Sequence, residues 1–364
     1  MQTQLTVAPA RWWHVPGLSR LIRETRRTRT AAGGEGALVW APRWSPSLGL
    51  LQSVWASPVA VMPGPRSFVA EEAHRPVGLA QIRPRREPQQ WDVAYFAVEP
   101  PPASANGTAG NGQDGAAARV RHVPDRRAAR LLGGLCDAGV QVGAERLLAR
   151  IAEDGPAYDI FRQLGFTPVV REYTYFRRPA DGADGADGLE GVSAAPPPPP
   201  PIEGLRPQRR ADAFGVLQLY QECTPKVVQM AEGKRSASWE LPVDGLGHRL
   251  TRRSRVLRWV VERDARKVAW VQLHIQRRGP HVLRMMVDER TPDLAQPLVE
   301  FALAALEGET HHGVIVRVRE HQQRLLAALE ACEFVPVDGQ LLMVKQLAAP
   351  VVQRQFAGVL EKVV

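Results

Sequence analysis

Hydrophobic and polar residues alternate along the first half of the chain with two distinct periods. Period-two runs predict three strands, followed by an apolar stripe at i, i+3, i+4 and i+7 from Ala128 to Gly139 that predicts a helix. A short strand and a second helix, with Phe161 on its apolar face, come next. The predicted strands are Leu5–Ala8, Ser67–Ala73, Val77–Arg83, Trp91–Val98, Arg146–Ile151, Phe166–Val170 and Tyr173–Phe176, with a helix at Val15–Thr25.

The same order of elements recurs in the second half. A strand at Leu205–Gln208 precedes a helix at Ala211–Cys223, and an apolar helix runs from Leu294 to Ala305. Further strands are predicted at Val256–Glu262, Lys267–Gln276, Val282–Val287, Gly313–Arg319 and Leu341–Lys345. Both halves end in a helix, the pattern Phe-x-Pro-Val and a strand. The chain therefore reads as a tandem duplication of a mixed α/β unit, in which an antiparallel meander feeds a parallel crossover.

Low-complexity stretches mark the boundaries between these units. Ala180–Gly191 repeats an Ala-Asp-Gly unit, and Pro196–Pro201 is a stiff polyproline spacer. Pro100–Ala118 is predicted to be a disordered insertion at about 100–120. We expect a first domain at 1–179, a linker at 180–203, a second domain at 204–350, and a tail or helix at 351–364.

Composition narrows the function. The formal charge is +9, but the basic residues are scattered and form no continuous stripe, so nucleic-acid binding is not expected. Three distant cysteines exclude a disulfide scaffold or a zinc ribbon, and the histidines lack the spacing of metal ligands. No run is long and apolar enough to span a membrane, and no signal peptide is evident, so we expect a cytoplasmic protein without a metal.

The ending Phe161-Arg162-Gln163-Leu164-Gly165-Phe166, after a strand and the turn Ala152–Pro156, resembles the GNAT superfamily of N-acetyltransferases. The resemblance covers nearly the whole chain, once in each half, and is stronger in the first. It implies an α/β fold of two tandem GNAT-like domains, each a mostly antiparallel sheet with a parallel crossover and flanking helices.

The resemblance also implies acetyl-CoA, or another acyl-CoA, as co-substrate. In that family the pantetheine pairs with the strand before the crossover helix, which here places Phe96 and Val98 beside it. The pyrophosphate caps the helix that follows, where amide groups and the helix dipole favour anions. Arg126, Arg127 and Arg130 lie there, but the turn has no glycine. These arginines either hold phosphate or form a solvated helix start.

The corresponding stretch of the second half, Val287–Leu294, carries three carboxylates. Asp288, Glu289 and Asp293 lie where the resemblance would put a pyrophosphate, and like charges weaken binding. We therefore expect the second domain to be structural and the first to be the active one.

The catalytic positions of the family are altered in this chain. The family often has a Tyr that acts as the acid and an Asn that contacts the cofactor; the corresponding residues here are Phe161 and Asp154. By this resemblance, we expect both to contact the cofactor. Tyr158, one turn before Phe161, either replaces the acid or is a surface residue. Glu71, Glu72 and Asp92 are acidic groups near the central strands, among which the sequence does not select a base. Tryptophans cluster before residue 56, either as an acceptor pocket or as core.

The sequence thus suggests an acyl-CoA-dependent N-acetyltransferase that acts on an amine of a small molecule or peptide. The alternative is a GNAT-fold ligand-binding or interaction module without catalysis. Neither a membrane nor a nucleic acid is expected as a partner, and a homodimer is compatible with both hypotheses.

Overall fold

The computed structural model describes most of both halves of the chain. The described residues are 5–14, 16–18, 20–21, 38–40, 66–85, 87, 89–99, 126–153, 155, 157–179, 201–241, 254–277, 279–306 and 312–347. Asp154, the expected insertion, the linker up to residue 200 and the tail lie outside them, as do Trp44 and Trp55 of the early tryptophans. Among the described residues, no helix is long and apolar enough to cross a membrane, and no group of side chains could hold a metal ion.

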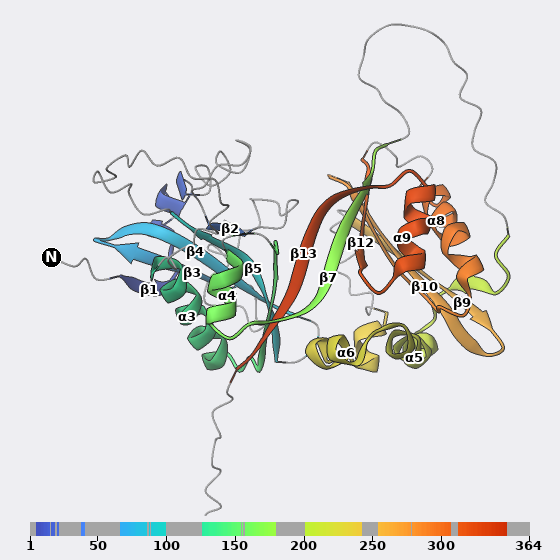
Figure 1. Ribbon diagram of the computed structural model, residues 1–364, viewed down its shortest axis with the longest axis horizontal. Helices are drawn as coiled ribbons and strands as arrows, with labels where there is room; N and C mark the ends of the chain where they lie inside the picture. Colours follow the sequence, from blue (N-terminus) through green and yellow to red (C-terminus); the bar gives the residue numbers. More distant parts are fainter. Residues whose placement is uncertain are drawn as a thin grey trace, which may run out of the picture.

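The first half has a meander of antiparallel strands and one parallel pair (Figure 1). Its strands are β1 (Thr6–Pro9), β3 (Arg66–Glu72), β4 (Arg75–Pro84), β5 (Gln90–Val98) and β6 (Arg146–Ile151). A short strand, β2 (Leu38–Trp40), also pairs with β5. The crossover from β5 to β6 is helix α3 (Arg126–Gln141), and α4 (Ala157–Gln163) follows β6. Strands β5 and β6 are parallel from Gln90↔Arg146 to Asp92↔Leu148 and then separate.

The second half repeats this order. Its strands are β8 (Leu205–Pro207), β9 (Ser254–Arg263), β10 (Arg266–Gln276), β11 (His281–Val287) and β12 (Val314–Arg319). Its helices are α5 (Ala213–Cys223), α6 (Lys226–Glu232), α8 (Ala295–Ala304) and α9 (Gln323–Ala331), with single 3-10 turns at Arg210–Asp212, Ser236–Trp239 and Pro292–Leu294. The first half has one such turn, at Trp12–His14. The parallel pair is β11 and β12, from His281↔Val314 to Leu283↔Val316.

The closing strands of the two halves are exchanged. Strand β13 (Val335–Gln346) from the end of the second half lies between β6 and β7 (Thr167–Arg177), and β7 pairs on its other edge with β12. One sheet therefore runs through both halves (Figure 1). This differs from the expectation that Phe166–Val170 and Tyr173–Phe176 close the first sheet. They form the single strand β7, which closes the sheet of the second half. The two closing strands have the same hydrophobic pattern, so pattern alone does not assign either to an edge.

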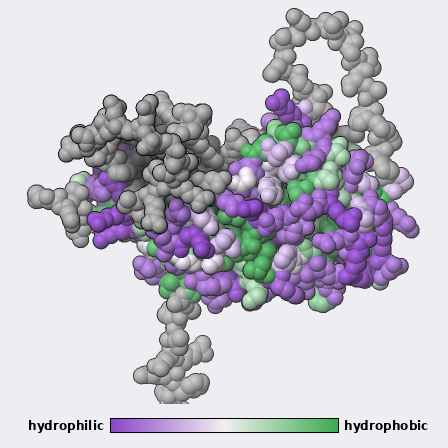
Figure 2. Space-filling view, viewed as in Figure 1, coloured by the Kyte–Doolittle hydropathy of each residue, from purple (hydrophilic) through white to green (hydrophobic). Residues whose placement is uncertain are grey.

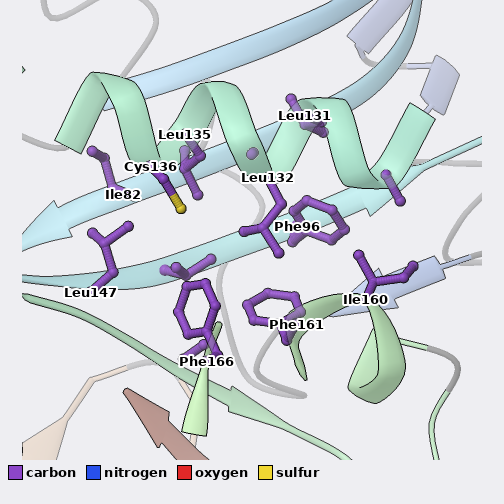
Figure 3. Close-up of a cluster of buried hydrophobic side chains, with 14 of the residues drawn as sticks. Ile82, Phe96, Leu131, Leu132, Leu135, Cys136, Leu147, Ile160, Phe161 and Phe166 are labelled. Atoms are coloured by element: carbon purple, nitrogen blue, oxygen red, sulfur yellow. The ribbon is translucent and has the colours of Figure 1, made fainter. Parts of the chain in front are cut away.

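The first hydrophobic core lies between α3, α4 and the sheet. Leu131, Leu132 and Leu135 of α3 face the strands because the apolar stripe of the helix is continuous. Figure 3 shows Phe161 and Phe166 pointing into this core beneath Leu132, next to Phe96. The second half has an equivalent core under α8 and α9.

The opposite face of the sheet is covered by α5 and α6 of the second half. Val228 and Ala231 of α6 pack on Leu148, Val170 and Leu342, which come from β6, β7 and β13. Helix α6 of the second half thus covers β6 and β7, which come from the first half, as well as β13. On the face drawn in Figure 2, the second half is mostly hydrophilic, and hydrophobic residues gather near the middle of the molecule.

Candidate functional site

A cavity of about 370 Å³ lies where the two halves meet. Asp92, Arg150, Arg317 and Arg319 line it, and along their strands they alternate with residues of the two helix-covered cores. The cavity therefore lies on the face opposite α3, α4, α8 and α9.

The lining of this central cavity is strongly basic. It contains seven cationic side chains and three carboxylates, which are Asp92, Glu172 and Glu232. The cationic residues are Arg83, Arg85, Arg150, Lys234, Arg284, Arg317 and Arg319. A concave surface with such an excess of positive charge attracts anions.

Glu172 of β7 lies between two of these arginines. It is 3% exposed and accepts hydrogen bonds from Arg150 Nε at 2.6 Å and Arg319 Nε at 3.2 Å. Burial alone would raise the pKa of the Glu172 carboxyl, but Arg150 and Arg319 overcome this effect and lower it to about 2. Glu172 is therefore ionised at neutral pH.

Glu232 at the end of α6 makes the second buried pair. Arg319 Nη2 donates to Glu232 at 2.6 Å, and the Tyr220 hydroxyl donates to it at 2.8 Å. Burial opposes ionisation of Glu232, yet Arg319 lowers its pKa. Burial and the nearby Glu232 charge raise the pKa of Tyr220. Tyr220 thus keeps its proton, and Arg319 connects the two carboxylates.

Asp92 is held more loosely than the other two carboxylates. It lies 3.6 Å from Arg85 Nη1 and 3.6 Å from Arg150 Nη1, and within the described residues it has no hydrogen bond. Its side chain is 32% exposed. Asp92 is the last residue of β5 that pairs with β6, so it lies at the point where these strands separate.

A β-bulge follows directly after Asp92. In the pairing of β5 with β4, Tyr95 is opposite Gln81 and Val93 is opposite Ile82, so Ala94 has no partner in β4. A bulge disrupts the ladder locally and re-aims the backbone. Val93 and Ala94 also line the central cavity. The fork of β5 and β6 thus opens into this cavity at an irregular stretch of backbone.

Beyond the fork, strand β2 occupies the same edge of β5 from Phe96 to Val98. Strand β2 pairs with β5 through Leu38↔Val98, Val39↔Ala97 and Trp40↔Phe96. Strand β4 pairs with the other edge of β5. β2 therefore lies on the same edge as β6, and it also contacts α4. This is the edge on which the family resemblance places the pantetheine.

The three predicted phosphate-binding arginines lie on the first turns of α3. Arg126 is exposed, whereas Arg127 forms a hydrogen-bonded ion pair with Glu72, with Nε 2.8 Å from Oε1. Arg130 Nη1 donates to the Leu5 carbonyl at 2.9 Å. Two of the three arginines thus connect α3 to neighbouring strands.

The other predicted site residues belong mainly to the first core. Phe96 and Phe161 are fully buried with ring centroids 5.6 Å apart, and Val98 is buried as well. Tyr158 is half-buried against this core. None of these four residues lines the central cavity. Of the three acidic candidates near the strands, only Asp92 does; Glu71 contacts His14 Nε2 at 3.1 Å.

A second cavity, of about 270 Å³, lies at the fork of the second half. It is lined by Asp288 and Glu289, which follow β11, by Gln322, which precedes α9, and by Leu325 in the first turn of α9. Asp293 lies outside it and contacts Arg263 at 2.9 Å. His321 and Gln322 line both cavities, so the two adjoin.

Sequence analysis missed most of the residues that line the central cavity. A signal for them was present, because central strands covered on both faces are usually apolar throughout. Arg284 in β11 and Arg317 in β12 interrupt such runs, as Arg150 does in β6. What the pattern did not contain was the exchange of strands that brings Arg150, Glu172 and Arg319 together.

Comparison with known proteins gives the fold. No protein-family model matches the chain, and no curated protein matches it in sequence. A solved tandem GNAT protein from the clavulanic acid biosynthesis pathway, without AcCoA, is 14% identical over 95% of this chain and 99% of that chain, with a TM-score of 0.50. This chain therefore has the tandem GNAT fold, and the expected fold is confirmed.

Two further solved structures match with lower TM-scores. A GCN5-related N-acetyltransferase from Sphaerobacter thermophilus is 14% identical over 94% of this chain and 96% of that chain, with a TM-score of 0.49. Saccharomyces cerevisiae N-myristoyltransferase with bound myristoyl-CoA is 10% identical over 94% of this chain and 83% of that chain, with a TM-score of 0.49.

Proposed function

We propose that the protein is an acyl-CoA-dependent acyltransferase with an amine acceptor, and that transfer takes place at the fork of β5 and β6. The observation that carries the proposal is the bulge at Ala94, which interrupts the ladder of β5 where this strand leaves β6 and borders the central cavity. The donor would approach along β5 and the amine from the cavity. Arg126, Arg127 and Arg130 remain our candidates for the phosphate contacts, and acetyl-CoA is the donor to test first.

The chemistry requires few groups. The neutral amine nitrogen attacks the thioester carbonyl carbon, a C–N bond forms, the C–S bond breaks, and the thiolate leaves and takes up a proton. A backbone N–H at the bulge would polarise the carbonyl oxygen. Asp92 is our candidate for the group that accepts the proton of the amine, because Glu172 and Glu232 are already held by direct hydrogen bonds. Tyr158 remains the candidate for the acid, and the second half would shape the acceptor side.

A ligand-binding module without turnover is the second candidate. The observation in its favour is the pairing of β2 with Phe96–Val98, on the edge that a pantetheine would use. Under this hypothesis the cavity binds its ligand and no acyl group is transferred.

Release of the CoA thiol distinguishes the two. The full chain is incubated with acetyl-CoA or longer acyl-CoAs and a panel of amines, and amine-dependent thiol release is expected. Asp92→Asn should lower the rate by about 100-fold or more, since a general base contributes this much. Asp264→Asn, in the exposed turn between β9 and β10, is the matched control and should act as wild type. Acyl-CoA binding without thiol release with any amine would favour the binding module.

A further inference from the structure

Two arginines stand next to each other at the fork of the second half. Parallel pairing of β11 and β12 ends at Leu283↔Val316, and Arg284 and Arg317 are the next residue on each strand. Leu283 and Val316 belong to the core under α8 and α9, so the arginines point to the opposite face, into the central cavity.

Arg284 and Arg317 differ from Arg85, Arg150 and Arg319 in having no carboxylate partner; among the described residues, Arg83 at the cavity has none either. Arg150 and Arg319 are paired with Glu172 and Glu232, whereas neither fork arginine has a hydrogen bond or ion pair within the described part of the chain. Both residues are exposed, and their side chains open to the cavity, where a ligand can reach them.

Their environment disfavours the two positive charges. Burial lowers the pKa of Arg317 to about 10, and the charge of Arg150 contributes to this change. Burial likewise lowers the pKa of Arg284, and so do the charges of Arg150 and Arg85. The charges of Glu172 and Asp92 act in the opposite direction, without contacting either arginine. A bound anion would add to them and would give each guanidinium group a hydrogen-bonded partner.

Unsatisfied polar atoms gather around the same cavity. In the described part of the chain, six buried side-chain polar atoms lack a hydrogen bond. Four of them belong to lining residues: Arg85 Nη1, Asp92 Oδ1, Trp239 Nε1 and His321 Nδ1. Arg85 Nη1 and Asp92 Oδ1 lie 3.6 Å from each other, so Trp239 Nε1 and His321 Nδ1 are the two that lack any polar contact among the described residues. Because buried polar groups are nearly always paired, these two atoms indicate a polar ligand at this place.

The size and the remaining wall of the cavity limit the ligand. A volume of about 370 Å³ is within the range of small-molecule sites. Trp239, Trp270 and Met286 form an apolar side of the lining. The occupant is therefore a small molecule with a charged end and an apolar part.

We propose that the acceptor is a small amine bearing a carboxylate or a phosphate group, and that Arg284 and Arg317 bind this anionic group. That the ligand is the acceptor of the reaction rests on the proposed function. That the ligand is an anion rests on the cavity alone. A guanidinium group can donate two parallel hydrogen bonds to the oxygens of one carboxylate or phosphate, which fixes the orientation of the ligand and adds affinity.

Three compounds that share the leucine side chain but differ in the terminal group test whether an anion is required. They are leucine, leucinamide and the aminophosphonate analogue of leucine. They are added to the full chain without an acyl donor, and the thermal midpoint and the Kd from calorimetry are measured. Leucine or the phosphonate should raise the midpoint and bind roughly tenfold or more tightly than leucinamide, and the preferred one identifies the anionic group. If neither of them, nor inorganic phosphate at millimolar concentration, stabilises the protein, the inference is wrong.

Variants test the two arginines. Arg284→Ala and Arg317→Ala should each weaken anion binding roughly tenfold or more. Arg255→Ala, an exposed arginine of β9, is the control and should leave binding unchanged. Without ligand, Arg317→Ala should keep or raise the thermal midpoint, because within the described residues this exposed side chain has no hydrogen bond or ion pair to lose. If the midpoint falls instead, Arg317→Lys decides: retained binding supports the inference, whereas full binding by both alanine variants overturns it.

The test separates this inference from the proposed function. Anion binding without thiol release from any acyl-CoA would leave the arginine site intact and reject the transfer reaction. Thiol release that is as fast with leucinamide as with leucine or the phosphonate, and unchanged in both alanine variants, would retain the reaction and reject the anionic acceptor.

Discussion

At the scale of single residues, Glu172 shows how a buried charge can belong to two halves of a protein at once. Its carboxylate lies on β7, and its partners Arg150 and Arg319 come from β6 and β12. Breaking a buried pair by removing one partner is costly, because the other charges stay behind without compensation. Glu172 is thus a point where acid should weaken the contact between the halves.

Glu172→Gln should destabilise the protein by about 3 kcal/mol at pH 7, which corresponds to the lowering of its pKa from 4.5 to about 2. A carboxylate with a lowered pKa stabilises the fold above its unfolded pKa. Its contribution is therefore present above pH 4.5 and is lost as the pH falls towards 2. Denaturant unfolding across this range should show the difference between wild type and variant shrinking with acid.

The control for this prediction is an exposed pair. Glu153 contacts Arg171 on the surface, where ion pairs contribute little. Glu153→Gln should change the unfolding free energy by less than about 1 kcal/mol at every pH. An equal effect of the two variants would contradict the role given to Glu172.

At the scale of elements, strand β2 is the feature that most affects the proposed reaction. It extends the sheet along the edge of β5 that a donor would use, so donor and strand exclude each other. Binding of a ligand that competes with a folded segment is weakened by the free energy needed to displace it.

Leu38→Pro should strengthen acyl-CoA binding by the full chain. Glu99 donates its N–H to the Val77 carbonyl of β4, so by alternation Val98 faces β2, and Leu38 is its partner there. Proline cannot donate a hydrogen bond in a ladder, so this variant should weaken the pairing of β2 with β5. Calorimetric titration with acetyl-CoA should give a lower Kd for this variant, while Leu38→Val, which keeps β propensity, should bind as wild type. A higher Kd for Leu38→Pro would mean that β2 supports the donor site instead of covering it.

Most elements could be predicted from sequence, because each has a clear hydrophobic period. Strand β6 matches its predicted bounds of Arg146–Ile151, and the stripe from Ala128 to Gly139 lies within α3. Helix α6 was not expected, because its apolar residues do not keep to one face: Val228 is buried, whereas Val227 and Met230 are exposed. The central cavity was not expected either, since its residues come from separate strands that only the exchange of β7 and β13 brings together.

At the scale of the whole molecule, the exchange makes the halves depend on each other for completion. Without β13, strand β6 would lose a neighbour along its length, and without β7, strand β12 would lose one as well. The core of Leu148, Val170, Leu342 and α6 likewise mixes both halves. The chain should therefore unfold as one cooperative unit.

Cleavage between the halves tests this dependence. A protease site placed at Pro196 should yield two pieces that stay together through size-exclusion chromatography, because each supplies a strand to the other. Each piece expressed alone should be insoluble or unfolded, since it exposes an unpaired strand edge. Two pieces that separate and stay folded would contradict the interdependence of the halves.

The strand exchange also has a consequence for synthesis on the ribosome. Strand β6 ends at Ile151, and its partner β13 begins about 180 residues later. At 5–20 residues per second, the nascent chain waits about 10 to 40 s before this partner has been made. During that interval the edge of β6 is open to other chains, so the yield of native protein should depend on chaperones that shield the nascent chain.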